Sequence, residues 1–408
     1  MKCSEIGYFG YLSFINKIII ILFLASLFFS FQYKLMTTVT LLLVVFNLFI
    51  KGKEKIKSIL TFMKINRLVF LTYAVFIICN SFMIFFIDFS KNDLNEAFDF
   101  FKYSLFIFIP ILFIDKKEQF NNIIKGIGCI SIAFICYIFY NHFILHILRA
   151  SLAPTIDAYL LLMLGPFGII ALKYFKTSKI IYYIYFVLYI IALIFMETRA
   201  AWIAFAGTVI IILFLLRKYI GYKKIILIIA LSAIVISLFS PMLMQRIDFT
   251  LNYKKNYTIE RVYIWKSSIN IIKDNFFTGI GMEKDKFKNL YDSKYQLPES
   301  REKHILHPHN AWLYFFVTSG VLGCLTFIIH LLAIIKYFYN NYNISNLFVL
   351  VGIWFITVTI IGSIFEAYFY FDLFLKLYAI LLSLIVMGIS MENDKIDILE
   401  PYHADKNN

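Results

Sequence analysis

Long apolar runs recur along almost the whole chain, and they constrain its fold more than any other feature. A helix needs about 20 predominantly apolar residues to cross the hydrocarbon core of a bilayer. The backbone in lipid must bond within helices or within a closed barrel, and barrels show short alternating segments instead of long runs. The sequence therefore predicts an all-α polytopic membrane protein. We count about 12 transmembrane helices, near 14–32, 35–50, 66–88, 98–114, 126–146, 157–174, 180–196, 200–216, 224–241, 311–335, 346–364 and 368–390.

The composition agrees with this class. The chain is 61% hydrophobic and 16% charged, whereas about a quarter of the residues in a soluble protein are charged. Its net charge of +14 comes mainly from lysines in short loops, which indicates membrane orientation and gives no reason to predict nucleic-acid binding. The five cysteines include no CxxC pair, so neither a disulfide framework nor a metal knuckle is predicted.

The basic residues of the short loops predict how the chain is oriented. Alternate loops carry 15 lysines and arginines on one side of the membrane and 5 on the other. Because cytoplasmic loops are enriched in these residues, the first set faces the cytoplasm and both termini lie there too.

One polar segment, 242–310, is much longer than the other loops and divides the chain. It lies outside by topology, and long segments cross the membrane regardless of their charge. We therefore predict an N-terminal bundle of nine spans at 1–241, one large outer loop at 242–310 between spans nine and ten, three C-terminal spans at 311–390 and a cytoplasmic tail at 391–408. Within the loop, "TIERVYIWKSSINIIKDN" predicts an amphipathic helix near the bilayer, with apolar residues at 259, 262, 263, 265, 269 and 272.

Two arginines fall on the predicted outer side. Arg199 lies in the short hinge "FMETRAAWIAF", and Arg261 lies on the amphipathic helix. Each one alone is explained as well by a snorkelling side chain or a solvated helix face. Together they indicate an anion site at the membrane surface, since the planar guanidinium suits phosphate or carboxylate. The commonest membrane-borne anion with a group to transfer is a lipid phosphate.

Three of the seven histidines gather in "HILHPHNAWLYFFVTSGVLG", at the start of an apolar run. Their spacing does not favour zinc, because Pro308 prevents one helix from aligning His304, His307 and His309, and no cysteine is near. A general base needs only one histidine in a fixed position. His309 precedes Asn310, a suitable helix cap, so His309 is the candidate base. A boundary histidine bonded to the backbone remains the alternative.

These motifs resemble the O-antigen ligase family, which is related to O-antigen polymerases. The family signature is His-Asn, nine residues, Gly, two residues and Gly, and it is complete here in His309, Asn310, "AWLYFFVTS", Gly320, "VL" and Gly323. "ETRAAWIAFAG" resembles the outer-hinge arginine motif of the family, with threonine in place of the usual serine. "ERVYIWKSSINIIKDNFFTGIGMEKDKF" resembles the opening of the large periplasmic loop, and "SIFEAYF" resembles the acidic hinge before the last span.

The resemblance implies a glycosyltransferase of lipopolysaccharide biosynthesis in the bacterial inner membrane, with a GT-C-like fold and an active site that faces the periplasm. It implies an inverting, metal-independent reaction without a cofactor. The donor is an undecaprenyl-diphosphate-linked glycan and the acceptor is a sugar hydroxyl of lipid A–core. By analogy, His309 is the catalytic base, Arg199 and Arg261 bind the diphosphate, and the supporting residues are Asn310, Gly320, Gly323 and Glu366.

Two other functions stay open at this point. An O-antigen polymerase uses a similar donor, although such enzymes often carry two separate arginine-rich periplasmic loops and one large loop is predicted here. A flippase or other transporter would place ionisable residues or broken helices at mid-membrane depth. The candidates for such features are Lys17, His330, Asp372, Lys376, Pro110 and Pro166.

Overall fold

The structure is a computed structural model that describes residues 52–53, 56–114, 116–146, 154–222, 226 and 257–393. Two of the predicted spans, 14–32 and 35–50, lie outside the described residues, and so does the span 224–241 except for residue 226. All regular secondary structure in the described part is helical, which agrees with the predicted fold class. The helices, with short 3₁₀ or π segments labelled η, are α3 (Arg67–Phe82), η1 (Met83–Phe86), α4 (Lys91–Ser104), η2 (Leu105–Phe108), α5 (Ile109–Phe113), α6 (Lys117–Phe143), α7 (Pro154–Tyr174), α8 (Lys179–Phe195), α9 (Arg199–Ile220), α12 (Tyr257–Asp274), α13 (Lys284–Leu290), η4 (Tyr291–Tyr295), α14 (Ala311–Asn340), α15 (Leu347–Phe365), η5 (Tyr368–Tyr370) and α16 (Asp372–Glu392).

Seven helices in the described part are long and apolar enough to cross a membrane, namely α3 with η1, α6, α7, α9, α14, α15 and α16. The apolar helix α8 is shorter. The predicted span at 98–114 departs from expectation, because this stretch is divided among the end of α4, η2 and α5. Pro110 at the start of α5 offers no N–H to continue a helical ladder from the preceding turn. The total of 12 spans stays a prediction.

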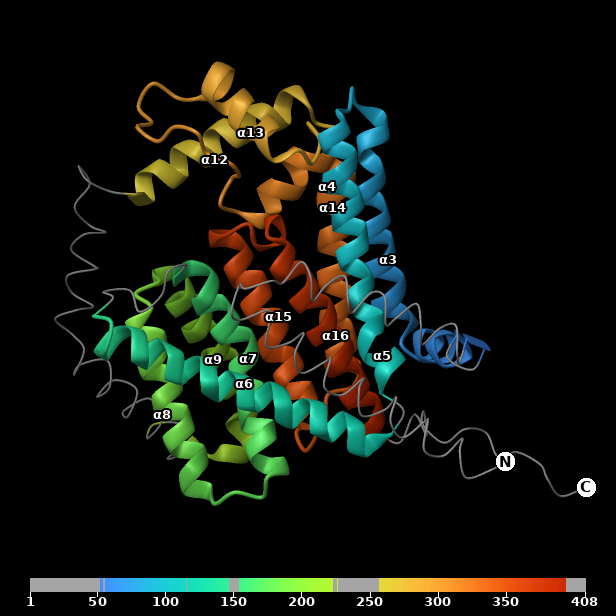
Figure 1. Cartoon of the computed structure of the whole chain (residues 1–408), viewed down its shortest axis with the longest axis vertical. Helices are drawn as coiled ribbons and strands as arrows, with labels where there is room; N and C mark the ends of the chain where they lie inside the picture. Colours follow the sequence, from blue (N-terminus) through green and yellow to red (C-terminus); the bar gives the residue numbers. More distant parts are fainter. Residues whose placement is uncertain are drawn as a thin grey trace, which may run out of the picture.

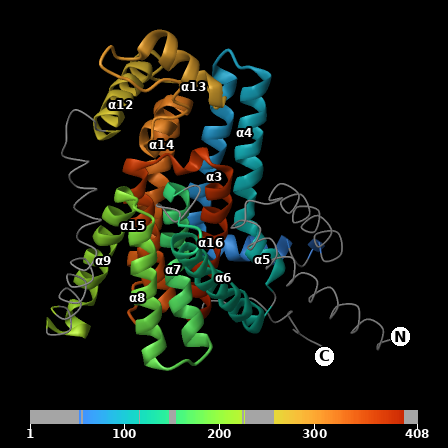
Figure 2. The same ribbon diagram turned by 60° about the vertical axis from the view of Figure 1, so that its left-hand side comes forward.

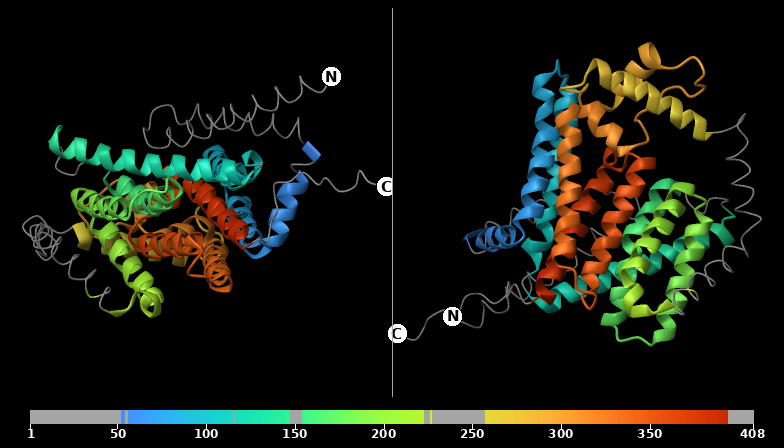
Figure 3. Two further views of the ribbon diagram at one scale, coloured as in Figure 1. Left: turned by 90° about the horizontal axis from the view of Figure 1, so that it is seen from below. Right: turned by 180° about the vertical axis from the view of Figure 1, so that it is seen from behind.

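The C-terminal helices form the centre of the bundle. α16 is buried along almost its whole length and packs against α15, α4 and η2, while α14 packs against α3 and α15. Figures 1 and 2 show α3, α14, α15 and α16 running roughly side by side. α6 crosses this group at a steep angle and packs mainly on α7. The views in Figure 3 show the same crossing from below and the upright helices from behind.

The described part of the predicted outer loop, 257–310, covers one end of this bundle (Figures 1 and 2). The helix predicted in this segment is observed as α12, and its position near the bilayer stays a prediction. α12 buries Ile264, Ile271 and Ile272 against the neighbouring segments, whereas Val262 and Ile269 are exposed apolar side chains on its other side. An apolar stripe left outside the core is typical of a helix at the membrane interface.

Hydrogen bonds at a break in α14 attach this loop to the bundle. Gly320 has φ 66° and ψ −165°, which interrupts the helix. The carbonyls of Val317 and Thr318 accept hydrogen bonds from the N–H groups of Ile280 (2.8 Å) and Gly281 (3.0 Å). A Cβ at position 320 would lie 2.2 Å from the Phe277 carbonyl oxygen. Glycine is therefore required here by both the backbone angle and the close approach of the loop.

A second attachment joins α13 to the start of α4. Asp93 is fully buried, accepts the backbone N–H of Glu283 at 2.9 Å and forms an ion pair with Lys286. The Glu283 carboxylate in turn accepts a hydrogen bond from the Ser90 hydroxyl at 2.7 Å. Because these contacts are buried or half-buried, they fix the loop rigidly over this end of the bundle.

Candidate active site

The predicted site lies where α14 begins and α15 ends, beneath the loop. Asn310 is the N-cap of α14, as predicted, and its side-chain oxygen accepts the Leu313 N–H at 3.0 Å. Its amide nitrogen donates to the Ile364 carbonyl at 2.9 Å, near the end of α15. Asn310 therefore fixes the two helix ends to each other. His309, directly before it, has a left-handed backbone (φ 50°), a conformation that turns its side chain at the helix mouth.

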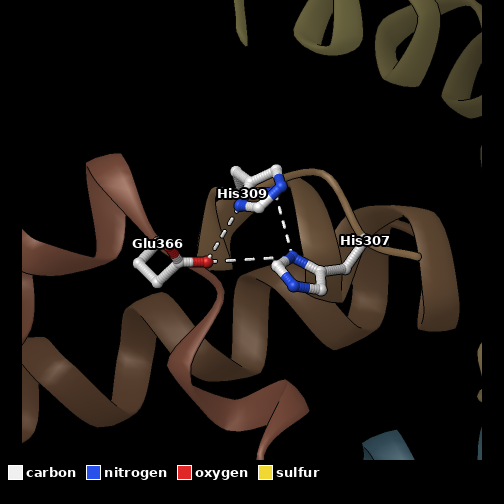
Figure 4. A group of neighbouring side chains, drawn as sticks. All are labelled: His307, His309 and Glu366. Atoms are coloured by element: carbon white, nitrogen blue, oxygen red, sulfur yellow. Dashed lines mark hydrogen bonds and ion pairs between the residues drawn. The ribbon is translucent and has the colours of Figure 1, made fainter. Parts of the chain in front are cut away.

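Two histidines and one carboxylate converge at this point (Figure 4). His309 Nδ1 lies 3.1 Å from Glu366 Oε1, and His307 Nδ1 lies 3.8 Å from the same oxygen. The His309 backbone N–H donates to His307 Nδ1 at 3.2 Å. This bond requires a lone pair on His307 Nδ1, so a neutral His307 carries its proton on Nε2. A neutral His309 that donates from Nδ1 to Glu366 keeps Nε2 free to accept a proton.

The charge state of the cluster follows from its burial and its neighbours. Burial alone would raise the pKa of the Glu366 carboxyl, but the hydrogen bond from His309 and the positive charge of Arg261 hold this pKa below its ordinary value. Glu366 is thus an ionised group that is only 6% exposed. Burial, with further contributions from His309 and Arg261, lowers the pKa of His307 to about 3. His307 is consequently a neutral hydrogen-bonding residue at physiological pH.

Arg261 of α12 is bound to the same helix end. Its NH1 donates to the Phe365 carbonyl at 2.8 Å, and its NH2 lies 3.7 Å from Glu366 Oε2. The side chain is 32% exposed, so part of it still faces solvent. The structure therefore brings Arg261, the predicted cation, and His309, the predicted base, to opposite oxygens of the Glu366 carboxylate. The sequence had predicted only a supporting role for Glu366.

Arg199 begins α9 and is half-buried. α9 packs on α15. Gly207, early in α9, lies against Ile361, late in α15, whereas the Leu215 carbonyl, late in α9, accepts a hydrogen bond from Tyr342, just before α15. The two helices therefore run in opposite directions. Arg199 is eight residues before Gly207, about 12 Å along the axis, and Glu366 follows Ile361 by about 7 Å. Both therefore lie toward the same end of the bundle. A shared anion site for Arg199 and Arg261 stays a prediction.

The other predicted residues are more dispersed. His304 is exposed and pairs with Asp292 at 2.7 Å, away from the cluster. Gly320 and Gly323 do not continue one regular helix face, because α14 breaks at Gly320. Gly320 meets the loop, whereas Gly323 faces α3, where an added Cβ would lie 2.7 Å from Asn80 Oδ1. The role of Gly323 as a close helix contact agrees with expectation, and that of Gly320 is different.

The cluster also offers ligands to a metal ion. One atom each of His307, His309 and Glu366 lies within 4.8 Å of the others, and two histidines with one glutamate are a known ligand set for catalytic zinc. The sequence argument against zinc considered only the three histidines and missed Glu366. Two features disfavour a cation here. Arg261 already neutralises the carboxylate, and the lone pair of His307 Nδ1 is occupied by the His309 N–H. The absence of a metal stays a prediction.

Residues 184–328 match the family model described as O-antigen ligase. The match confirms the resemblance that the sequence motifs predicted. It runs from α8 to α14 and includes Arg199, Arg261 and His309, but it ends before Glu366. No individual curated protein matches the chain.

Proposed function

We propose that this chain, a multi-pass membrane protein of the O-antigen ligase family, transfers a glycan from undecaprenyl diphosphate to a sugar hydroxyl of lipid A–core. The reaction is inverting and uses no metal ion. The enzyme has a GT-C-like arrangement in the inner membrane of a bacterium, with both termini in the cytoplasm and the covered end of the bundle in the periplasm. The large loop 242–310 then lies above the outer leaflet, where the diphosphate of a membrane-bound donor is within reach.

The chemistry follows from the positions of three side chains. His309 Nε2 takes the proton of the acceptor hydroxyl, while Glu366 bonded at Nδ1 stabilises the resulting imidazolium. The acceptor oxygen attacks the anomeric carbon, the bond from this carbon to the phosphate oxygen breaks, and undecaprenyl diphosphate leaves with the electron pair. Arg261, with Arg199 from the same end of the bundle, stabilises the negative charge that grows on the leaving diphosphate.

The contact between His309 and Glu366 carries this proposal. A structural histidine at a helix boundary would need only backbone partners, whereas this one is paired with a buried, ionised carboxylate that also binds an arginine. A carboxylate in this position fixes the tautomer and the orientation of the imidazole.

Transfer by the purified protein tests the proposal directly. The full chain in lipid nanodiscs receives undecaprenyl-diphosphate-linked glycan and lipid A–core in the presence of EDTA, and glycosylated lipid A–core is measured. Wild type is expected to form product, and His309→Ala is expected to be slower by about 10²–10⁴-fold. Product formation by His309→Ala at the wild-type rate would exclude its role as base, and a requirement for added Zn²⁺ would exclude a metal-independent reaction.

Other products would identify the other functions. A polymerase elongates the donor glycan and leaves lipid A–core unmodified, and a flippase moves the donor between leaflets without forming a glycosidic bond. The same assay separates the two transferases, because mass spectrometry distinguishes elongated donor from modified acceptor, whereas a flippase would leave both substrates unchanged.

A further inference from the structure

The backbone of His309 has a conformation that residues with a side chain rarely adopt. Its φ is 50°, whereas the next residue, Asn310, is extended with φ −161°. The left-handed region costs free energy for a residue with a Cβ, and it persists only where the surroundings hold it. Because this backbone sets the direction in which the His309 imidazole leaves the chain, the contact that holds the backbone is part of the geometry of the site.

His307 supplies such a contact. Its Nδ1 accepts the backbone N–H of His309 at 3.2 Å (Figure 4). Asn and Asp side chains stabilise turns by the same kind of bond, from a side-chain acceptor to the backbone N–H two residues later. The residue between the two histidines is Pro308, whose φ is fixed by its ring. The bond therefore closes a short loop of backbone around a stiff residue.

The His307 ring is itself held in place. Its side chain is 8% exposed, and its centroid lies 4.4 Å from that of Tyr370 and 5.7 Å from that of Phe371, both in the segment after α15. Packing therefore fixes the acceptor atom before any substrate binds. Because burial lowers the pKa of His307 to about 3, its Nδ1 lone pair also stays available at physiological pH.

Two other roles for His307 do not fit its contacts. The His309 N–H occupies the Nδ1 lone pair, and a neutral imidazole in this tautomer carries its proton on Nε2. No lone pair is then left to take a proton from a substrate. His307 Nδ1 also lies 3.8 Å from Glu366 Oε1, which is too far for a hydrogen bond, so His307 does not orient the carboxylate directly.

We propose that His307 is a positioning residue for the base: its Nδ1 holds the backbone of His309 in the left-handed conformation, and this conformation brings the His309 imidazole to Glu366. The inference rests on the proposed function and adds the residue that sets the geometry of proton transfer. Without the bond, the backbone of His309 returns to the ordinary region of φ, and its Nδ1 leaves its position 3.1 Å from Glu366 Oε1. A misplacement of about 1 Å lowers the rate of a catalysed step by about 10²-fold.

Two substitutions of His307 separate its hydrogen bond from its packing. His307→Phe keeps a ring against Tyr370 and removes the acceptor. His307→Asn removes the ring and keeps an acceptor, because its Oδ1 is as many bonds from Cβ as Nδ1 is. His307→Leu has nearly the shape of His307→Asn and lacks both the ring and the acceptor, so it serves where the larger phenylalanine does not fold.

Steady-state transfer in nanodiscs gives the first readout, with thermal unfolding as the control for folding. His307→Phe and His307→Leu are expected to lower kcat by about 10–100-fold, with the KM of each substrate within about twofold of wild type. His307→Asn is expected to keep kcat within about threefold. The matched control is His304→Leu, at an exposed histidine that pairs with Asp292, and it should change neither constant. Wild-type kcat in His307→Leu, or a larger loss in His307→Asn than in His307→Phe, would overturn the inference.

A measurement that needs no turnover separates failure of this inference from failure of the proposed function. Solid-state NMR of the full chain with ¹⁵N-labelled histidine reports the tautomer of His309, whose signal is identified by its loss in His309→Ala. Wild type and His307→Asn are expected to show the single tautomer with the proton on Nδ1, whereas His307→Leu is expected to show both tautomers. An unchanged His309 signal in His307→Leu would overturn the positioning role. A changed signal in a protein whose wild type forms no product would keep the positioning role and refute the proposed reaction.

Discussion

Replacing Glu366 with glutamine tests whether its charge acts on His309. When His309 accepts the proton of the acceptor, an imidazolium forms with Nδ1 3.1 Å from the carboxylate. At an effective dielectric constant of about 20, two unit charges at this separation attract by about 5 kcal/mol. Arg261 lies 3.7 Å from the other oxygen and already satisfies part of the carboxylate's charge, so we assign about half of this energy to the transition state.

A loss of about 2.5–3 kcal/mol corresponds to a kcat lower by about 10²-fold. Glutamine keeps the size of the side chain and offers its carbonyl oxygen to Nδ1, so the variant removes charge while preserving the hydrogen bond. The assay is single-turnover glycan transfer to lipid A–core in nanodiscs, with thermal unfolding as the control for folding.

A double-mutant cycle distinguishes action through His309 from a structural role. If the carboxylate stabilises only a protonated imidazole, Glu366→Gln in the His309→Ala background should cost less than about threefold, because the charge to be stabilised no longer forms. An equal loss in both backgrounds would refute the coupling and would assign Glu366 to holding Arg261 instead.

Three further outcomes concern stability and the loop. Burial lowers the pKa of His307 in the folded protein to about 3, so the unfolded chain binds one more proton than the folded chain below about pH 6.5. The free energy of unfolding should therefore fall by about 2 kcal/mol as the pH is lowered from 7.5 to 5. Thermal unfolding of His307→Gln should lack this pH-dependent loss. Gly320→Ala forces a side chain into a backbone conformation with φ 66° against the Phe277 carbonyl and should destabilise the protein by more than about 2 kcal/mol, whereas Gly52→Ala, which meets no atom within 4 Å, should not. Asp93→Asn breaks the buried ion pair with the partly exposed Lys286, so it should lower the free energy of unfolding by about 2 kcal/mol and speed proteolysis within 257–310. Unchanged cleavage would show that the contacts at the break in α14 are enough to hold the loop.

Hydropathy was sufficient to predict the helical class and most of the spans, because a span must bury its backbone bonds and expose apolar side chains whatever it packs against. Seven of the predicted runs coincide largely with one α-helix each of the described part, such as 311–335 with α14 and 368–390 with α16, and the run at 66–88 coincides with α3 and η1. The run at 98–114 did not, since its helix changes to a 3₁₀ segment ahead of Pro110. Periodicity cannot show such a change, which depends on local backbone bonding.

The site could be predicted residue by residue but not as an assembly. The motif identified His309 and Asn310, the N-cap of α14, since both lie at the first turn of one helix. The partner of His309 is 57 residues away, and no spacing rule connects a loop histidine to the end of another helix.

Burial explains why the same residue types have different roles. His304 and His307 are three positions apart in the sequence, yet one is exposed beside Asp292 and the other is enclosed between His309 and Tyr370. Removal of water lowers the pKa of a buried imidazole, as it does for His307, and only His307 lies between His309 and Tyr370. The environment of His307 therefore depends on how His309 and the segment after α15 enclose a single imidazole, a property that no local sequence pattern contains.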